Sequence, residues 1–287
     1  MTRIPVNGIE LNVEVEGKGP AVLLLHGFTG DVSTWDTFLP VLGGFETVRI
    51  DLIGHGASDA PEEPHRYSMD HAVEDICAIL DHFRLNEIGL LGYSLGGRVA
   101  LHFALRHPER LWGLVLESAS PGIESADERR ARIASDEALA SDLLRDGIEP
   151  FIDRWQSQAL FASQSSLPAE VQERQRRLRL SQSPLGLANS LRGMGAGRQD
   201  YLMPELGRIN VSTMLIAGEL DTKYAALTQE MAAMIPDVGM DVVPGAGHAV
   251  HMEAPERFSR VAGTFLMLVI SDIMGRRHQE MHWGRKG

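Results

Sequence analysis

Apolar runs of strand length alternate along the chain with longer segments in which apolar residues recur at helical spacing. Polar residues rarely interrupt the runs, which is typical of parallel strands covered on both faces of a sheet. We predict strands at Ala21–His26, Thr47–Leu52, Ile88–Tyr93, Gly113–Glu117, Thr213–Gly218 and Met240–Pro244. We predict helices at Met69–Phe83, Leu95–Arg106, Tyr224–Ile235 and Pro255–Ile270. This alternation indicates an α/β fold with a doubly wound, mostly parallel sheet.

Two segments depart from this alternation. Residues 4–16 alternate in polarity around Asn7-Gly8, which predicts an antiparallel hairpin at the sheet edge. Residues 121–205 are polar, favour helix, and hold 11 of the 24 arginines and no lysine. Because this stretch separates two core strands, we expect it to form a helical lid over the carboxyl ends of the strands, where open α/β sheets bind ligands. The predicted division is a core of residues 1–120 and 206–275, a lid of residues 121–205 and a flexible tail of residues 276–287.

Composition narrows the class of protein further. The chain of 287 residues is 44% hydrophobic and 23% charged, as in globular proteins that bury a core without disulfides. Its single cysteine, Cys77, favours the reducing cytoplasm. The net charge of −12 argues against nucleic-acid partners. The chain starts without an apolar signal segment, and the run Phe265–Ile270 is too short to span a bilayer, so we expect a cytoplasmic protein without membrane insertion.

The strongest local motif is Gly92-Tyr93-Ser94-Leu95-Gly96, a G-x-S-x-G sequence between a predicted strand and a predicted helix. A serine at such a turn is exposed above the sheet, and the flanking glycines let strand and helix pack closely. The helix N-terminus also offers unpaired N–H groups to a developing negative charge. The context therefore predicts that Ser94 is a nucleophile.

A serine of this kind needs a histidine base and a carboxylate that orients the histidine. Asp221 follows the strand that ends at Gly218, and His248 follows the strand that ends at Pro244. Both would lie at the same sheet edge as Ser94, in the chain order serine, acid, histidine that is typical of this motif. We therefore predict a Ser94–His248–Asp221 triad. The alternatives are His251 as the base and Glu219 or Glu117 as the carboxylate.

His26-Gly27-Phe28 follows the first of the core strands. In this position the backbone N–H groups of Phe28 and Leu95 would form an oxyanion hole. The turn-rich stretch from Asp51 to Asp59 is assigned a structural role. The sequence has no histidine and carboxylate spacing typical of a metal site and no phosphate-binding glycine loop, so we predict no metal and no cofactor.

Together these motifs, from Ala21 to Pro255, resemble the α/β-hydrolase superfamily. A closer resemblance lies in segments that the general fold does not require: LHGFTGDVSTW, LESASPGI, SLRGMGAGRQ, GELDTKY and AGHAVHMEAP. These segments are similar to the family of 2-succinyl-6-hydroxy-2,4-cyclohexadiene-1-carboxylate synthases of menaquinone biosynthesis, over nearly the whole chain up to about Ile270. The resemblance implies a lyase that eliminates pyruvate from an enolpyruvyl cyclohexene carboxylate, with the triad acting as the base.

The substrate implied by this resemblance carries three carboxylates, so it needs cations. Arg98 lies one helical turn after Ser94 and is expected to point toward the site. By resemblance, Arg132 and Arg179 of the lid bind carboxylates, with Arg130 and Arg177 as alternatives that differ in helix register. Tyr93 and Trp155 are pocket residues by the same resemblance. The expected partner is a small tricarboxylate, and the expected assembly is a monomer or a small homo-oligomer.

Two other functions remain open at this point. A Ser–His–Asp site usually performs acyl transfer, so a carboxylesterase or carbon–carbon hydrolase is the main alternative. A plain esterase has no need of arginines at positions 98, 132 and 179, which favours the lyase. A ligand-binding protein with an inactive hydrolase pocket is the third possibility, and the intact triad argues against it.

Overall fold

The computed structural model describes the backbone of residues 2–283 and the side chains of residues 2–276. Its centre is one eight-stranded sheet in the order β1-β2-β4-β3-β5-β6-β7-β8. The strands are β1 (Thr2–Val6), β2 (Ile9–Gly17), β3 (Ala21–Leu25), β4 (Glu46–Ile50), β5 (Ile88–Tyr93), β6 (Leu111–Glu117), β7 (Thr213–Gly218) and β8 (Val238–Val243). The helices are α1 (Met69–His82), α2 (Leu95–Arg106), α3 (Ala126–Asp146), α4 (Ile148–Gln156), α5 (Ala169–Leu180), α6 (Pro184–Met194), α7 (Thr222–Ala232), α8 (Val250–Glu253) and α9 (Pro255–Trp283).

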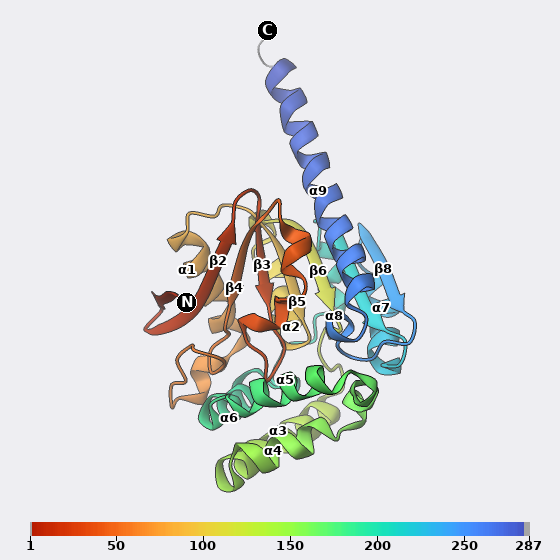
Figure 1. Ribbon diagram of the computed structural model, residues 1–287. Helices are drawn as coiled ribbons and strands as arrows, with labels where there is room; N and C mark the ends of the chain where they lie inside the picture. Colours follow the sequence, from red (N-terminus) through yellow and green to blue (C-terminus); the bar gives the residue numbers. More distant parts are fainter. Residues whose placement is uncertain (1, 284–287) are drawn as a thin grey trace.

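The α/β architecture predicted from the hydrophobic pattern is confirmed. Strands β3 to β8 pair in parallel, and the hairpin β1–β2 joins them through antiparallel pairing of β2 with β4. Every residue of β3 and β6 is buried, which explains why these strands read as continuous apolar runs. Core residues of α1, α2 and α7 pack on one face of the sheet, and those of α9 on the other. All the parallel strands therefore end at one edge, next to the lid (Figure 1).

Helices α3 to α6 form the segment between β6 and β7, and they lie across the carboxyl edge of the sheet (Figure 1). The sequence pattern predicted helix in this segment without the bounds of the individual helices. The four helices share a small apolar cluster of their own, which includes Leu143, Phe151 and Leu187. The segment leaves and returns at one point, where the Leu202 N–H donates to the Pro121 carbonyl at 2.6 Å.

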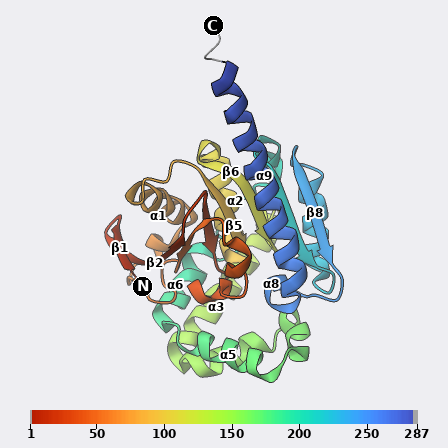
Figure 2. The ribbon, with the colours of Figure 1, turned by 45° about the horizontal axis from the view of Figure 1, so that its top comes forward.

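The last helix differs from its prediction. We expected a helix ending near Ile270 and a flexible tail from Arg276, but α9 runs from Pro255 to Trp283 and projects beyond the sheet (Figures 1 and 2). The rest of the predicted tail, residues 284–287, lies outside the described residues. Among the described residues, the stretch Pro255–Arg276 is long and apolar enough to cross a membrane by length and composition, with mean hydropathy 1.4. Its first turns are fixed in the core, because Phe258, Ala262 and Leu266 are fully buried there.

Candidate active site

Ser94 occupies the sharp turn between β5 and α2. Its φ of 50° and ψ of −104° lie outside the usual regions for a residue with a side chain. The glycines on either side are required sterically, because a Cβ at Gly92 would come within 2.3 Å of the Gly96 carbonyl oxygen. A Cβ at Gly96 would come within 2.3 Å of the Leu25 carbonyl oxygen. The strained turn therefore holds the serine hydroxyl above the end of the strand.

The three predicted triad residues come together although they are far apart in the sequence. Ser94 Oγ lies 3.0 Å from His248 Nε2, and His248 Nδ1 lies 2.6 Å from Asp221 Oδ2. Asp221 and His248 are both buried, with 7% and 2% of their surface exposed. The carboxylate accepts from Nδ1–H, which leaves Nε2 free to accept a proton from the serine. This arrangement can generate a basic or nucleophilic serine oxygen.

The backbone around the triad is held by further hydrogen bonds. Asp221 caps helix α7 by accepting from the Tyr224 N–H at 3.4 Å, so its second oxygen is used as well. The Ser118 hydroxyl donates to the His248 carbonyl at 2.8 Å. The histidine loop is thus anchored to the end of β6, and the aspartate to the start of α7.

The alternative triad members have other partners. His251 Nδ1 lies 2.9 Å from both carboxylate oxygens of Glu117, and Glu117 is fully buried. The third alternative, Glu219, accepts from the Gly245 N–H at 3.0 Å. None of these groups is hydrogen-bonded to Ser94 within the described residues. The geometry thus brings together the residues that the sequence favoured, and a second histidine–carboxylate pair lies beside them.

The loop after β3 presents the N–H group of Phe28 next to the elbow. His26 orders this loop: its Nδ1 lies 2.7 Å from the Gly27 carbonyl and its Nε2 accepts from the Leu52 N–H at 3.0 Å. These partners require the neutral tautomer with the proton on Nδ1. Across the described residues, the N–H groups of Phe28 and Leu95 have no hydrogen-bond partner. They are therefore free to bind an oxyanion.

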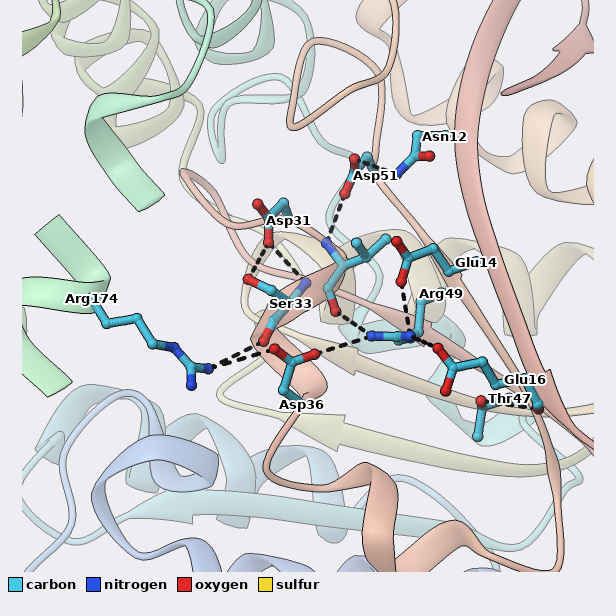
Figure 3. Close-up of polar contacts among 11 residues, drawn as sticks. Asn12, Glu14, Glu16, Asp31, Ser33, Asp36, Thr47, Arg49, Asp51 and Arg174 are labelled. Atoms are coloured by element: carbon cyan, nitrogen blue, oxygen red, sulfur yellow. Dashed lines mark hydrogen bonds and ion pairs between the residues drawn. The ribbon is translucent and has the colours of Figure 1, made fainter. Parts of the chain in front are cut away.

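A polar network fixes the far side of the same loop (Figure 3). Asp51 Oδ1 accepts from the Val32 N–H at 2.7 Å, and its Oδ2 accepts from Asn12 Nδ2 at 2.8 Å. The buried guanidinium of Arg49 pairs with Glu14, Glu16 and Asp36. Asp51, assigned a structural role from the sequence, thus holds the start of the short helix after the Phe28 loop.

A cavity of about 240 Å³ opens over the serine, between the sheet edge and the lid. Besides Ser94 and His248, its lining includes the following residues predicted from the sequence: Phe28, Tyr93, Leu95, Arg98, Arg132, Trp155 and Arg179. Trp155 packs its ring edge-to-face on Phe28, with centroids 5.0 Å apart. The Tyr93 ring lies 5.5 Å from that of His248, and burial raises the pKa of this tyrosine, which keeps it neutral.

Arg179 extends from α5 into this cavity and is 7% exposed. Its Nη2 donates to Gln164 Oε1 at 3.2 Å, and its guanidinium lies 5.3 Å from the Phe161 ring centre. Burial lowers the pKa of this arginine. No carboxylate of the described chain forms an ion pair with it, so its charge is uncompensated. The neighbouring Arg177 is exposed and pairs with Glu173, which settles the register of α5.

Arg98 reaches the same cavity from α2, as its spacing from Ser94 predicted. Its Nη1 donates to the Met194 carbonyl at 2.7 Å and to Gln199 Oε1 at 3.2 Å. Burial lowers its pKa to about 10, which leaves it charged at neutral pH. The described residues contain no ion-pair partner for Arg98 either.

Arg132 lines the cavity from α3, whereas its alternative Arg130 is exposed and pairs with Asp127. Arg132 Nε donates to Asp136 Oδ1 at 2.8 Å. Asp136 is 3% exposed and lines the cavity too, and burial raises its pKa although Arg132 opposes the shift. The charge of Arg132 is thus compensated by Asp136 within the protein.

Sequence reasoning missed several cavity residues. Asp136 follows Arg132 by four positions on one helix, a spacing that predicts an ion pair. Tyr224 follows the triad aspartate by three positions, and its ring lies 4.6 Å from that of His248. Phe161, which lines the cavity, and Gln164, which accepts from Arg179, lie in an irregular segment of the lid, where no periodicity marks them. Among the described residues no group of three or more histidine, cysteine or carboxylate side chains could hold a metal ion.

Comparison with known proteins places this site in a family. The model of the α/β-hydrolase fold family matches residues 20–255. A protein of Bacillus subtilis (strain 168), provisionally named a 2-succinyl-6-hydroxy-2,4-cyclohexadiene-1-carboxylate synthase, is 42% identical over 91% of this chain and 96% of its own length. The structure of MenH from S. aureus has a TM-score of 0.86 at 34% identity and covers 90% of this chain and 98% of its own.

An esterase is also among the structural neighbours. A thermophilic esterase from Thermogutta terrifontis, solved with malate bound, has a TM-score of 0.83 at 28% identity and covers 94% of this chain and 99% of its own. The fold alone therefore does not separate synthase from esterase, whereas the sequence similarity to the synthases extends over core and lid together. The chain belongs to the α/β-hydrolase fold family and, within it, to the 2-succinyl-6-hydroxy-2,4-cyclohexadiene-1-carboxylate synthases, enzymes of menaquinone biosynthesis.

Proposed function

We propose that the protein eliminates pyruvate from 2-succinyl-5-enolpyruvyl-6-hydroxy-3-cyclohexene-1-carboxylate and forms 2-succinyl-6-hydroxy-2,4-cyclohexadiene-1-carboxylate, as a cytoplasmic enzyme. One observation carries the proposal: two guanidiniums without an ion-pair partner, Arg98 and Arg179, line the cavity above Ser94. Unpaired buried cations are costly, so a site that keeps them is suited to an anionic ligand that compensates them. A substrate with three carboxylates meets that need, and a neutral ester does not.

Ser94, His248 and Asp221 act as the base in this proposal. His248 Nε2 takes the hydroxyl proton of Ser94 across 3.0 Å while Asp221 stabilises the resulting imidazolium. The serine oxygen then removes the ring proton next to the succinyl ketone. The N–H groups of Phe28 and Leu95 stabilise the enolate oxygen that develops.

The electron pair of the broken C–H bond passes through the enolate into the ring. The ring double bond shifts by one position, the bond from the ring to the enolpyruvyl oxygen breaks, and the diene forms. The released enolpyruvate takes up a proton and becomes pyruvate. The step is redox-neutral and needs no water and no acyl-enzyme, so we propose that it proceeds without a cofactor.

The proposal is tested by coupling pyruvate release to lactate dehydrogenase, with the substrate made in situ by the preceding enzyme of the pathway. We expect Ser94→Ala to lower the rate by about 10³-fold or more, because the base is lost. Ser135→Ala, which removes another hydroxyl that lines the cavity, should keep most of the wild-type rate. Undiminished pyruvate release by Ser94→Ala would sink the mechanism.

A carboxylesterase is the second candidate, and its support is the similarity to the Thermogutta esterase. The same preparations are therefore assayed with a nitrophenyl ester. Fast ester cleavage without pyruvate release would replace the lyase proposal with the esterase. Serine-dependent pyruvate release with weak ester cleavage supports the lyase.

A further inference from the structure

The outer part of α9 exposes large apolar side chains. Met267, Leu268 and Met274 are 48%, 66% and 56% exposed, whereas Phe258, Ala262 and Leu266 of the same helix are buried. Figures 1 and 2 show the helix continuing past the sheet as a projecting rod. A helix of the core has no need of apolar residues on its solvent side, so this exposed face indicates an interaction surface.

The exposed apolar residues form one stripe. With 3.6 residues per turn, Met267, Ser271 and Met274 follow one another along the helix, and Thr264 and Leu268 lie beside them. All five are exposed and uncharged. The charged neighbours Asp272 and Arg276 lie at the edge of the stripe and pair with each other at 3.0 Å. Three of the five, Met267, Leu268 and Met274, are large and apolar, as on the lipid-facing side of a helix that lies in a membrane interface.

The charge of the chain changes at the end of this stripe. Residues 276–287 contain four Lys or Arg against one Glu, and also Trp283, whereas the whole chain carries −12. In the sequence these basic residues directly follow the stripe. Basic segments near an apolar face favour an anionic lipid surface, and tryptophan is enriched at membrane interfaces. The active-site cavity faces the lid, at the opposite end of the molecule from the tip of α9, so binding through the tip would leave it open (Figure 1).

We infer that the outer part of α9 docks the protein reversibly on an anionic lipid surface. The helix does not cross the bilayer, because its first turns are part of the core. A second copy of the chain is a poorer occupant, because up to residue 276 the stripe offers only three large apolar side chains, which fall far short of the ~800 Å² per partner that a stable interface buries. The inference is independent of the reaction that the site performs.

The experiment is co-sedimentation of the full-length protein with vesicles of phosphatidylcholine alone or mixed with phosphatidylglycerol. We expect severalfold more bound protein on the mixed vesicles, and a decrease as salt is raised. The variant Met267→Ser/Leu268→Ser/Met274→Ser should lose binding at least fivefold. Met234→Ser/Met240→Ser, at exposed methionines outside α9, is the matched control and should bind like wild type.

The charge contribution is tested separately. Arg276→Gln/Arg277→Gln should weaken binding to the anionic vesicles, and Arg208→Gln, at another exposed arginine, should not. Equal binding to both vesicle types, or none to either, overturns the inference. A dimer in sedimentation analysis that the stripe variant dissociates also overturns it, because a second copy would then cover the stripe.

Discussion

The core and the lid contribute different things to one cavity. Ser94, Asp221 and His248 all come from turns at the ends of core strands, where backbone hydrogen bonds and close packing fix each of them. The lid contributes Arg132 and Arg179 from helices whose outer faces are exposed and which share a small apolar cluster. We therefore propose that the core supplies the base and one substrate-binding arginine, Arg98 of α2, and that the lid supplies the other arginines of the cavity.

The largest effect is expected from a variant that replaces the carboxylate of the core triad. Asp221→Asn should lower kcat for pyruvate release by about 10⁴-fold, because the amide favours the wrong histidine tautomer. Substrate affinity, measured by equilibrium binding, should change little because the lid is intact. Glu219→Gln is the control, since it alters the alternative carboxylate two residues before Asp221, and it should retain activity within a few-fold. Similar losses in both variants would contradict the assignment of Asp221.

A matched pair of arginines tests the lid. Arg179→Gln should raise KM for the tricarboxylate by about 10- to 100-fold, the loss expected for one charged hydrogen bond. Arg177→Gln, two residues away on the exposed face, should leave KM unchanged. Turnover of a neutral nitrophenyl ester should be the same in both variants. If Arg179→Gln impaired the ester equally, the residue would serve the fold and not the choice of substrate.

We expect low pH to lower the stability of the protein through histidines of the core, because none of the 11 histidines lies in residues 121–205. Burial lowers the pKa of His55 to about 3 and that of His102 to about 4. A base with a lower pKa in the folded than in the unfolded state binds fewer protons when folded. Its contribution to stability is therefore complete above pH ~6.5 and is lost as the pH falls toward 4.

For His102 we expect this loss to be about 3 kcal/mol of the free energy of unfolding between pH 7.5 and pH 4, and urea unfolding at the two pH values is the measurement that checks it. His102→Leu removes no hydrogen bond of the described structure and should reduce the pH dependence by that amount. His65→Gln, at an exposed histidine, should not. An unchanged pH dependence in His102→Leu would show that this residue is not the acid-sensitive group.

The smallest effect is expected at a contact between the two regions. Arg174 of α5 reaches the core loop near Ser33 and Asp36, at 3.4 Å and 4.0 Å (Figure 3). The side chain is half exposed, so Arg174→Ala should change the free energy of unfolding by about 0.5 kcal/mol or less. KM should stay within twofold. A large rise in KM would mean that this contact holds the lid in its working position.

Much of the core site follows from the sequence because parallel strands end at a common edge. That rule brings Ser94, Asp221 and His248 together from distant segments, and the elbow glycines mark the turn. The cavity arginines of the lid were harder to predict. The sequence left Arg130 as an alternative to Arg132, and Arg177 as an alternative to Arg179. Only the packing of α3 and α5 decides which arginine of each pair faces the cavity.

Other features depend on contacts that no local pattern records. The pairing of His251 with Glu117 joins positions separated by 134 residues. The length of α9 was underestimated because its outer turns carry glycine and exposed charges, and their apolar residues do not face the core. The four-residue spacing of Arg132 and Asp136 could have predicted their ion pair, but sequence reasoning missed it.

The close approach of the two ends of the lid has a practical consequence. Because the chain enters and leaves the lid at the hydrogen-bonded pair Pro121 and Leu202, this pair is a suitable point at which to exchange the intervening residues. A homologue's lid could be grafted at this point without changing strand register or the serine turn. Chimaeras of this kind would let new specificities be built on an unaltered catalytic frame.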